Sequence, residues 1–129
     1  MGILVDSHVL LWWFSESTRI RPAARQALLD PTSEIYVSVV SAWELAIKVG
    51  SGKLDIPAEL ATWLPAKLEE NHFVPLSVTL PHTLVVEHLP RHHADPFDRL
   101  LIAQAIVEGH TIVTSDAQFA RYDVPLIRA

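Results

Sequence analysis

Four carboxylates at the starts of helices are the residues of this sequence whose types and spacing could do chemistry. Asp6, Glu44 and Asp116 each follow an apolar run closely, and Asp98 lies in the first turn of a nearly all-apolar segment. Carboxylates that meet in one pocket repel one another, so they either take up protons or bind a cation. Oxygen ligands alone suit a hard ion, Mg²⁺ or Mn²⁺, which can activate water and hold the oxygens of a phosphodiester.

Two of these acids also have a purely local interpretation as helix caps. Asp95 is a good N-cap with Asp98 three residues later, and Ser41 with Glu44 has the S-x-x-E spacing of a capping box. Each segment taken alone favours the structural cap. Because the same arrangement recurs after several apolar runs, a shared site becomes the stronger hypothesis.

The elements that would position the acids alternate between strand and helix. The sequence predicts strands at 2–5, 35–37, 73–76, 111–114 and 124–127, and helices at 8–14, 22–29, 42–49, 57–70, 79–89, 96–107 and 117–122. This alternation is typical of an α/β fold with a mainly parallel sheet of four to five strands and helices on both faces. We expect one domain over residues 1–129. Ligands of such sheets bind at the carboxyl ends of the strands, where these acids are expected.

Composition removes several other classes of protein. The 129 residues include no Cys, which excludes disulfides, thiolate nucleophiles and cysteine-ligated zinc. No run approaches the roughly 18 apolar residues of a membrane span, and the N-terminus lacks a signal-peptide layout, so we expect a cytoplasmic protein without a membrane partner. The net charge of −5 does not exclude nucleic acid, because bound cations would reverse the local sign.

Two phosphate-binding motifs are not supported. The segment Gly50-Ser51-Gly52-Lys53 is not a phosphate loop, because Ile47 stands where that motif needs Gly and Leu54 where it needs Ser or Thr. The chain has no G-x-G-x-x-G. A phosphatase of small molecules is an alternative, but His8 stands where a D-x-D pattern would need a second Asp.

Histidines and an arginine beside the acids have several interpretations. His92 and His93 could bind zinc near Asp95, or His93 could act as a general acid. Adjacent histidines without a further paired set are more often exposed loop residues, which is the interpretation favoured here. Arg91, Arg99 and both histidines could contact RNA phosphates, and Arg99 could instead pair with Asp95 or Glu44.

Four segments in series resemble a PIN domain, and most closely the VapC-type toxins of bacterial toxin–antitoxin pairs. The segments are 4–12, 38–48, 95–105 and 113–116. The resemblance implies an endoribonuclease that hydrolyses RNA phosphodiester bonds with water activated by carboxylate-bound Mg²⁺ or Mn²⁺. Its acidic quartet would be Asp6, Glu44, Asp98 and Asp116.

The resemblance also implies a role for each acid. Asp6 and Asp98 would be direct metal ligands, and Asp116 would bind the same or a second ion, directly or through water. Glu44 would hold metal-bound water or take part in proton transfer. The neighbours expected to orient these groups or to contact RNA are Ser7, Thr114, Ser115, Arg99 and Asp95, the last chiefly as a cap.

Partners follow from the same resemblance. VapC-like proteins form homodimers, and a cognate antitoxin wraps the toxin and crosses its active site, so we expect both here. Trp12 and Trp13 lie about 100° apart on a helix, so one of them should meet a second helix layer or a partner unless both fill the core. The alternative function is a PIN-like module that binds RNA or protein without cleaving it.

Overall fold

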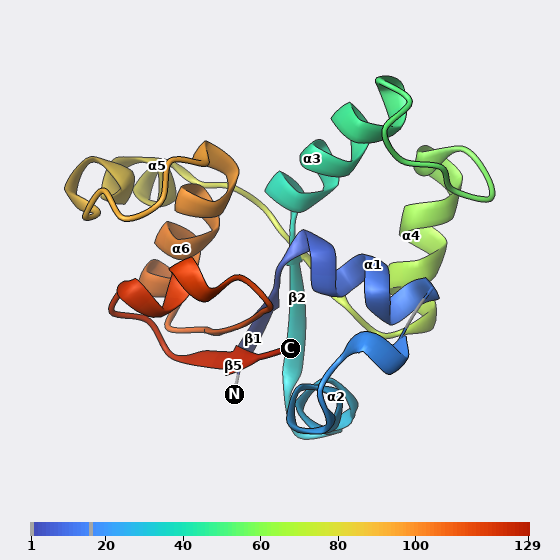
Figure 1. The fold of residues 1–129 in the computed structure, drawn as a ribbon, viewed down its shortest axis with the longest axis horizontal. Coiled ribbons are helices and arrows are strands. Elements are labelled where there is room, and N and C mark those ends of the chain that lie inside the picture. The colour runs from blue at the N-terminus through green and yellow to red at the C-terminus, as the bar shows by residue number, and fades with distance from the viewer. Residues whose placement is uncertain (1, 16) are drawn as a thin grey trace.

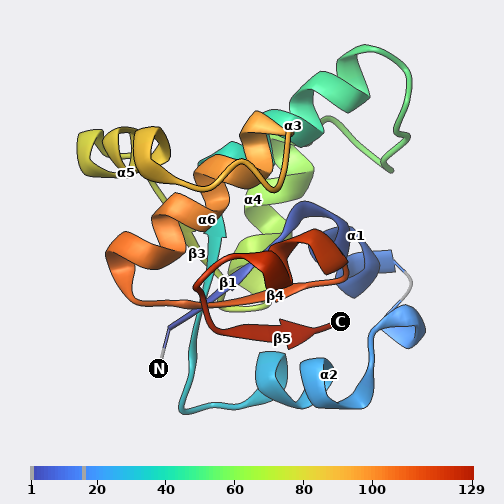
Figure 2. The same cartoon turned by 60° about the vertical axis from the view of Figure 1, so that its left-hand side comes forward.

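A five-stranded parallel sheet forms the centre of the molecule. The computed structural model describes residues 2–15 and 17–129. The strands are β1 (Gly2–Val5), β2 (Glu34–Ser38), β3 (Val74–Leu76), β4 (Thr111–Thr114) and β5 (Leu126–Arg128). They lie in the order β3-β2-β1-β4-β5, and every neighbouring pair is parallel. The predicted α/β fold and its sheet are therefore confirmed, and β4 and β5 can be followed side by side in Figure 2.

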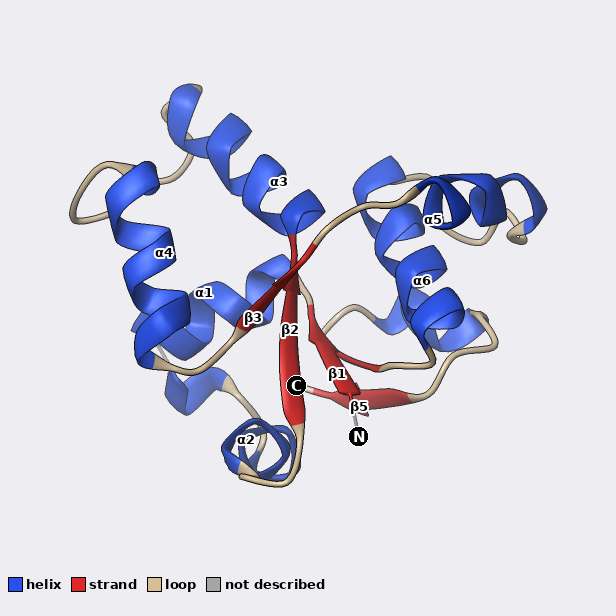
Figure 3. Ribbon diagram, turned by 180° about the vertical axis from the view of Figure 1, so that it is seen from behind, coloured by secondary structure: helices blue, strands red, loops and turns tan. Residues whose placement is uncertain are grey.

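Helices cover both faces of this sheet, as predicted. The α-helices are α1 (Ser7–Ser15), α2 (Pro22–Leu29), α3 (Val39–Gly50), α4 (Leu60–Glu70), α5 (Leu80–Val85) and α6 (Pro96–Glu108). Short 3₁₀ turns follow at η1 (Ser17–Arg19), η2 (Val86–His88) and η3 (Ala117–Arg121). Figures 1 and 3 show α1, α3 and α4 on one side of the sheet and α5 and α6 on the other. Within the described residues, no helix is long and apolar enough to cross a membrane.

The central strand β1 is buried on both faces because its residues are apolar without interruption. Ile3 and Val5 join a core formed with α1, α2 and α4, whereas Leu4 joins a second core formed with α6 and η3. This division follows from the alternation of side chains along a strand. A strand between two helix layers needs no polar positions, so its first carboxylate, Asp6, comes only where the strand ends.

Helix α6 begins as its sequence predicts. The Asp95 carboxylate accepts the backbone N–H of Phe97 at 2.8 Å, and Pro96 occupies the first helical position. The helix ends at Gly109, whose φ of 70° is the left-handed conformation that Gly adopts without strain. The buried middle of α6 therefore anchors its first turn, including Asp98, beneath the edge of the sheet.

Helix α3 begins earlier than predicted, and this corrects one local interpretation. The side chain of Ser38, the last residue of β2, accepts the N–H of Val40 at 3.0 Å and caps a helix that starts at Val39. The predicted capping box of Ser41 with Glu44 is therefore wrong, because both lie inside the helix. Two apolar β-branched residues at its start resemble a continuing strand, which placed the predicted boundary too late.

Two other helix boundaries also differ from the predictions. The helix predicted over 57–70 begins only at Leu60, and the helix predicted over 79–89 divides into α5 and η2. Pro75 lies in edge strand β3, as its missing N–H requires.

Candidate active site

Parallel register brings the ends of three strands to one edge of the sheet. Val5 pairs with Val37 on one side and with Val113 on the other. The residues that follow them, Asp6 among them, therefore lie at the same level. The predicted meeting of side chains from several strand ends is thus set by the sheet itself.

Asp6 is almost completely buried at this edge. One of its carboxylate oxygens, Oδ1, accepts the N–H of Val9 at 2.8 Å, and Oδ2 accepts the Thr114 hydroxyl. Burial raises the pKa of the Asp6 carboxyl above its ordinary value, and the two hydrogen bonds oppose that shift without cancelling it. Ionised Asp6 is consequently a costly group that a nearby cation would stabilise.

Thr114 connects Asp6 to Asp116. Its fully buried hydroxyl donates to Asp6 and accepts the backbone N–H of Asp116 at 3.0 Å. Ser115, expected beside it in the same role, hydrogen-bonds through its backbone carbonyl to Arg128 at 3.4 Å. Of the two neighbours predicted at the end of β4, Thr114 is thus the one that hydrogen-bonds to the acids within the described chain.

Asp98 and Asp116 converge on a third side chain, His93. The His93 Nε2 atom lies 3.0 Å from Asp98 Oδ2 and 2.9 Å from Asp116 Oδ2. Ligand atoms of these three residues all lie within 4.8 Å of one another, the spacing of a metal-binding group. Among the described residues, Asp6 and Glu44 do not belong to this tight group.

The Asp98 carboxyl also has a strongly shifted pKa. The pKa is raised to about 7, chiefly by burial and then by the negative charges of Asp95, Glu44 and Asp6, while His93 acts in the opposite direction. Without a cation, Asp98 is therefore about half protonated at neutral pH. An acid held in this state marks the point where negative charge is insufficiently compensated.

Asp116 has the opposite balance. Its partial burial tends to raise its pKa, but the N–H of Gln118, at 2.8 Å, and the imidazole of His93 outweigh burial and leave the pKa lowered. At neutral pH without a cation, Asp116 is therefore ionised, whereas Asp98 is about half protonated. The two carboxylates that contact His93 Nε2 thus differ in charge.

Glu44 reaches the site from α3 through Ser7. The Ser7 hydroxyl donates to Glu44 Oε1 at 2.8 Å, and Lys48 Nζ lies 3.4 Å from the other oxygen, Oε2. Ser7 directly follows Asp6 in the chain, so this hydrogen bond draws Glu44 toward the strand end. The fourth acid is accordingly connected to the site by a hydroxyl, as Asp6 is by Thr114.

Asp95 and Arg99 have structural contacts. Besides capping α6 at Phe97, Asp95 lies 3.4 Å from the N–H of Asp98, so it is the cap that the sequence favoured. Arg99 pairs with neither acid considered for it. Its guanidinium donates to the carbonyls of Pro90, Val86 and Leu89 at 2.8, 3.2 and 3.4 Å, and to the Tyr122 hydroxyl at 3.3 Å.

His93 is the functional-site residue that the sequence analysis placed wrongly. It is not an exposed loop residue, since its side chain is 14% exposed and contacts two of the acids. His92 instead packs edge-on against Tyr122, with ring centroids 5.3 Å apart. The sequence feature that could have indicated this role is the position of His93 two residues before the N-cap Asp95, from which a ring can reach the first turn of α6.

The donor set fits a hard divalent cation. Asp6, Asp98 and Asp116 offer carboxylate oxygens, and because burial raises the pKa of Asp6 and Asp98, a nearby cation would stabilise their charged forms. Mg²⁺ and Mn²⁺ prefer such oxygen ligands. The arrangement can therefore hold an ion against a phosphate group and position water beside it.

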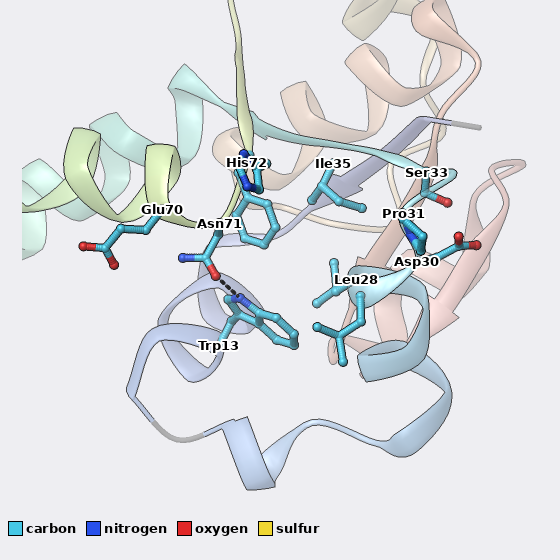
Figure 4. A pocket seen from close by; sticks show the side chains of 11 residues that line it. Trp13, Leu28, Asp30, Pro31, Ser33, Ile35, Glu70, Asn71 and His72 are labelled. Carbon is cyan, nitrogen blue, oxygen red and sulfur yellow. Dashed lines mark hydrogen bonds between the residues drawn. The ribbon is translucent and has the colours of Figure 1, made fainter.

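A hollow lies at the opposite end of the sheet from the acids. It encloses about 480 Å³ between α1, the loop before β2 and the end of α4, and Figure 4 shows its lining. Trp13 Nε1 donates to Asn71 Oδ1 there at 2.9 Å, and its ring lies 6.3 Å from that of Phe73. Trp12 and Trp13 are both half-buried and pack against the core formed with α1, α2 and α4, so the alternative in which both fill the core is the one observed.

Comparison with known proteins identifies the family of this chain. The model of the PIN domain matches residues 3–125. Ribonuclease VapC22 of Mycobacterium tuberculosis is 32% identical over 124 residues, which cover 95% of this chain and 93% of that protein. Ribonuclease VapC16 of the same organism is 37% identical over 59 residues, 46% of this chain and 42% of that protein.

Solved structures of toxin–antitoxin systems share the fold. VapBC2 from Rickettsia felis, bound to a DNA fragment from its promoter, has a TM-score of 0.76 at 18% identity and covers 99% of this chain and 98% of that one. A toxin–antitoxin complex from Klebsiella pneumoniae has a TM-score of 0.62 at 20% identity, with 97% and 95% covered.

Fold and site together define a metal-dependent nuclease domain of the PIN type. The chain belongs to the PIN domain family and, within it, to the VapC-type ribonuclease toxins of toxin–antitoxin systems.

Proposed function

We propose that this chain hydrolyses RNA at its four carboxylates, with Mg²⁺ or Mn²⁺ held by Asp6, Asp98 and Asp116. The observation that carries the proposal is the convergence of Asp98 and Asp116 at 3.0 and 2.9 Å from one nitrogen, beside a buried Asp6. Such concentrated negative charge is unfavourable by itself and becomes favourable around a cation. PIN nucleases depend on metal ions, and the choice between these two ions is part of the proposal.

Each acid contributes separately to the reaction. When bound, the divalent ion would lower the pKa of water and neutralise charge on the phosphoryl oxygens. Asp6, Asp98 and Asp116 would hold the ion from three different segments of the fold. Glu44, held by Ser7 at 2.8 Å, is placed to accept a proton from the attacking water.

The RNA backbone would approach through a hollow beside His93. This hollow has a volume of about 690 Å³. Its lining is Val86, Glu87, Arg91, His92, His93, Ala94 and Arg99. Arg91 is exposed and offers a cation for a phosphate next to the one being cleaved.

An apolar stripe on α3 supports the proposal that an antitoxin covers the site. Val39, Trp43 and Ile47, four residues apart, are 39%, 59% and 47% exposed. Trp43 also packs against Phe97 over a hollow of about 150 Å³. Exposed apolar surface of this kind marks protein interfaces. We propose a cognate antitoxin and a homodimer as partners, and action on RNA in the cytoplasm.

Cleavage of a mixed total-RNA substrate tests the proposed activity. Purified protein is incubated with Mn²⁺, with Mg²⁺ and with EDTA, and Asp6→Asn is assayed alongside to exclude a contaminating nuclease. Asn can still cap α1 through its side-chain oxygen, so this variant should fold. We expect cleavage with the metal ions, none with EDTA and none by the variant.

The same assay separates the two candidate functions. Cleavage that persists in Asp6→Asn or in EDTA would contradict the site assignment. A folded protein that binds RNA without cutting it under either metal would instead support the non-cleaving binding module.

A further inference from the structure

Contacts to the backbone and to the ring of His93 hold its side chain in one orientation. Its backbone N–H donates to the Tyr122 hydroxyl at 2.9 Å, and the Phe119 ring lies 5.9 Å away at an interplanar angle of 87°. Its Nδ1 atom accepts the backbone N–H of Asp95 at 3.1 Å. With the ring fixed in this way, Nε2 is the nitrogen that faces Asp98 and Asp116.

The Asp95 amide determines which ring nitrogen carries the proton. A neutral imidazole has one N–H and one bare nitrogen, and a nitrogen that accepts a hydrogen bond must be the bare one. Nδ1 accepts, so the proton of the neutral ring lies on Nε2. The Nε2–H group then donates toward the two carboxylate oxygens at 3.0 and 2.9 Å.

This tautomer is incompatible with binding of an ion through Nε2. A ligating nitrogen must offer its lone pair, which would require the proton to move to Nδ1. There it would point at the Asp95 N–H, so two donors would face each other at 3.1 Å. The spacing alone would include His93 among the metal ligands, whereas the hydrogen bond behind the ring excludes it.

We propose that His93 is a positioning residue that donates Nε2–H to Asp98 and Asp116 and presets their separation for the ion without binding the ion itself. This inference rests on the proposed function, in which both carboxylates hold the metal. Each carboxylate oxygen has two lone pairs, so an oxygen that accepts from His93 can still bind a cation. The two acids come from α6 and from the end of β4, and His93 spans them.

Such a donor matters because the two carboxylates repel each other before the ion arrives. Without His93, they would separate by side-chain rotation, and the ion would have to bring them together again. Hydrogen bonds behind metal ligands typically contribute about 10- to 100-fold in metal affinity. We expect an effect in this range for His93.

Nuclear magnetic resonance of ring nitrogens in ¹⁵N-histidine-labelled wild-type protein tests the tautomer directly. At mildly alkaline pH we expect Nε2–H and bare Nδ1 in the metal-free protein, unchanged after addition of diamagnetic Mg²⁺. A proton on Nδ1, or loss of the Nε2 proton when Mg²⁺ is added, would overturn the inference. This measurement needs no variant and is unaffected by folding defects.

A matched pair of amide variants tests the consequence for metal affinity. The side-chain nitrogen of Gln reaches the position of His Nε2, whereas that of Asn is too short. In Mn²⁺ titrations followed by electron paramagnetic resonance, we expect His93→Gln to bind within about 3-fold of wild type and His93→Asn about 10-fold more weakly or worse.

The outcomes distinguish failure of this inference from failure of the proposed function. If wild-type protein binds no Mn²⁺, both fall together. If wild type binds Mn²⁺ and His93→Asn binds it equally well, only the role of His93 is wrong. Equal weakening in both variants would also contradict it, because donation from the Nε2 position would then make no difference.

Discussion

The two ends of the sheet treat polar groups in opposite ways. At the amino ends, the indole N–H of Trp13 donates to Asn71 in a hollow lined both by apolar side chains such as Leu28 and Ile35 and by polar ones such as Glu70 (Figure 4). At the carboxyl ends, acids are crowded, and Asp98 has a pKa of about 7. The indole N–H at the amino ends has its hydrogen-bond partner, whereas the acids at the carboxyl ends have uncompensated negative charge.

This difference shows that the volume of a hollow does not identify the end of the sheet that carries the proposed site. Both ends contain hollows of several hundred Å³, about 480 Å³ at one and about 690 Å³ at the other. Hydrogen bonds from Thr32 lower the pKa of Asp30 at the amino-end hollow, whereas burial destabilises the charged forms of Asp6 and Asp98 at the carboxyl end. Such groups reduce stability and are retained where they act on a ligand.

The largest expected effect is loss of catalysis on removal of one charge from the acidic end. Asp98→Asn should lower metal-dependent RNA cleavage about 100-fold or more, because several kcal/mol of ion-mediated stabilisation is lost. The matched control is Asp30→Asn at the other hollow, where the carboxylate only holds Thr32. Full activity of Asp98→Asn in the RNA assay would refute the assignment of Asp98.

Ion binding should stabilise the acidic end and leave the other unaffected. At an Mn²⁺ concentration about 100 times the dissociation constant, we expect the free energy of unfolding to rise by about 2.7 kcal/mol. Thermal melts of wild type and Trp13→Phe should show the same gain. Asp98→Asn should lose most of it, and an equal gain there would place the ion elsewhere.

The stability of the metal-free protein should fall as pH rises from about 4 to about 7. The pKa of Asp98 is raised from 3.8 to about 7 in the folded state. The folded chain thus binds more protons than the unfolded chain across this window, and each rise in pH favours unfolding. Between these pH values, ionisation of Asp98 should lower the free energy of unfolding by on the order of 2 kcal/mol, and Asp98→Asn should remove this loss in urea titrations with EDTA. An unchanged slope would show that Asp98 does not titrate in this window.

The smallest expected effect is at the amino ends of the strands, where Trp13 donates to Asn71. Trp13→Phe removes the N–H that Asn71 accepts and should lower the free energy of unfolding by about 1 kcal/mol. RNA cleavage by this variant should equal that of wild type. A loss of cleavage at temperatures where the variant is folded would show that the two ends are coupled.

Most of the fold was predictable because it depends on local patterns. The apolar run of β1, the cap and proline that open α6 and the alternation of strands with helices all appear within short segments. The start of α3 was not predictable, since Val39 and Val40 suit a strand and only the Ser38 cap ends it.

The sequence predicts which acids form the proposed site but not the contacts between them. Asp6 and Asp116 are proposed from their places after strands and Asp98 from its place at the start of a helix, whereas the ring of His93 reaches Asp116 across 23 residues of sequence. Arg99, beside the acids in the chain, turns instead to carbonyls of the preceding segment. Contacts of this kind depend on tertiary packing and cannot be predicted from the spacing of residues in the sequence.

The direct join between β2 and α3 has a consequence for how this molecule can change. Ser38 ends the strand and caps the helix, so no loop separates them that could absorb an added residue. One residue inserted after Ser38 would rotate the later part of the helix by about 100° relative to the sheet. Glu44 and the exposed Trp43 would turn together, so the acid that we propose as catalytic and the apolar surface on α3 cannot change orientation independently.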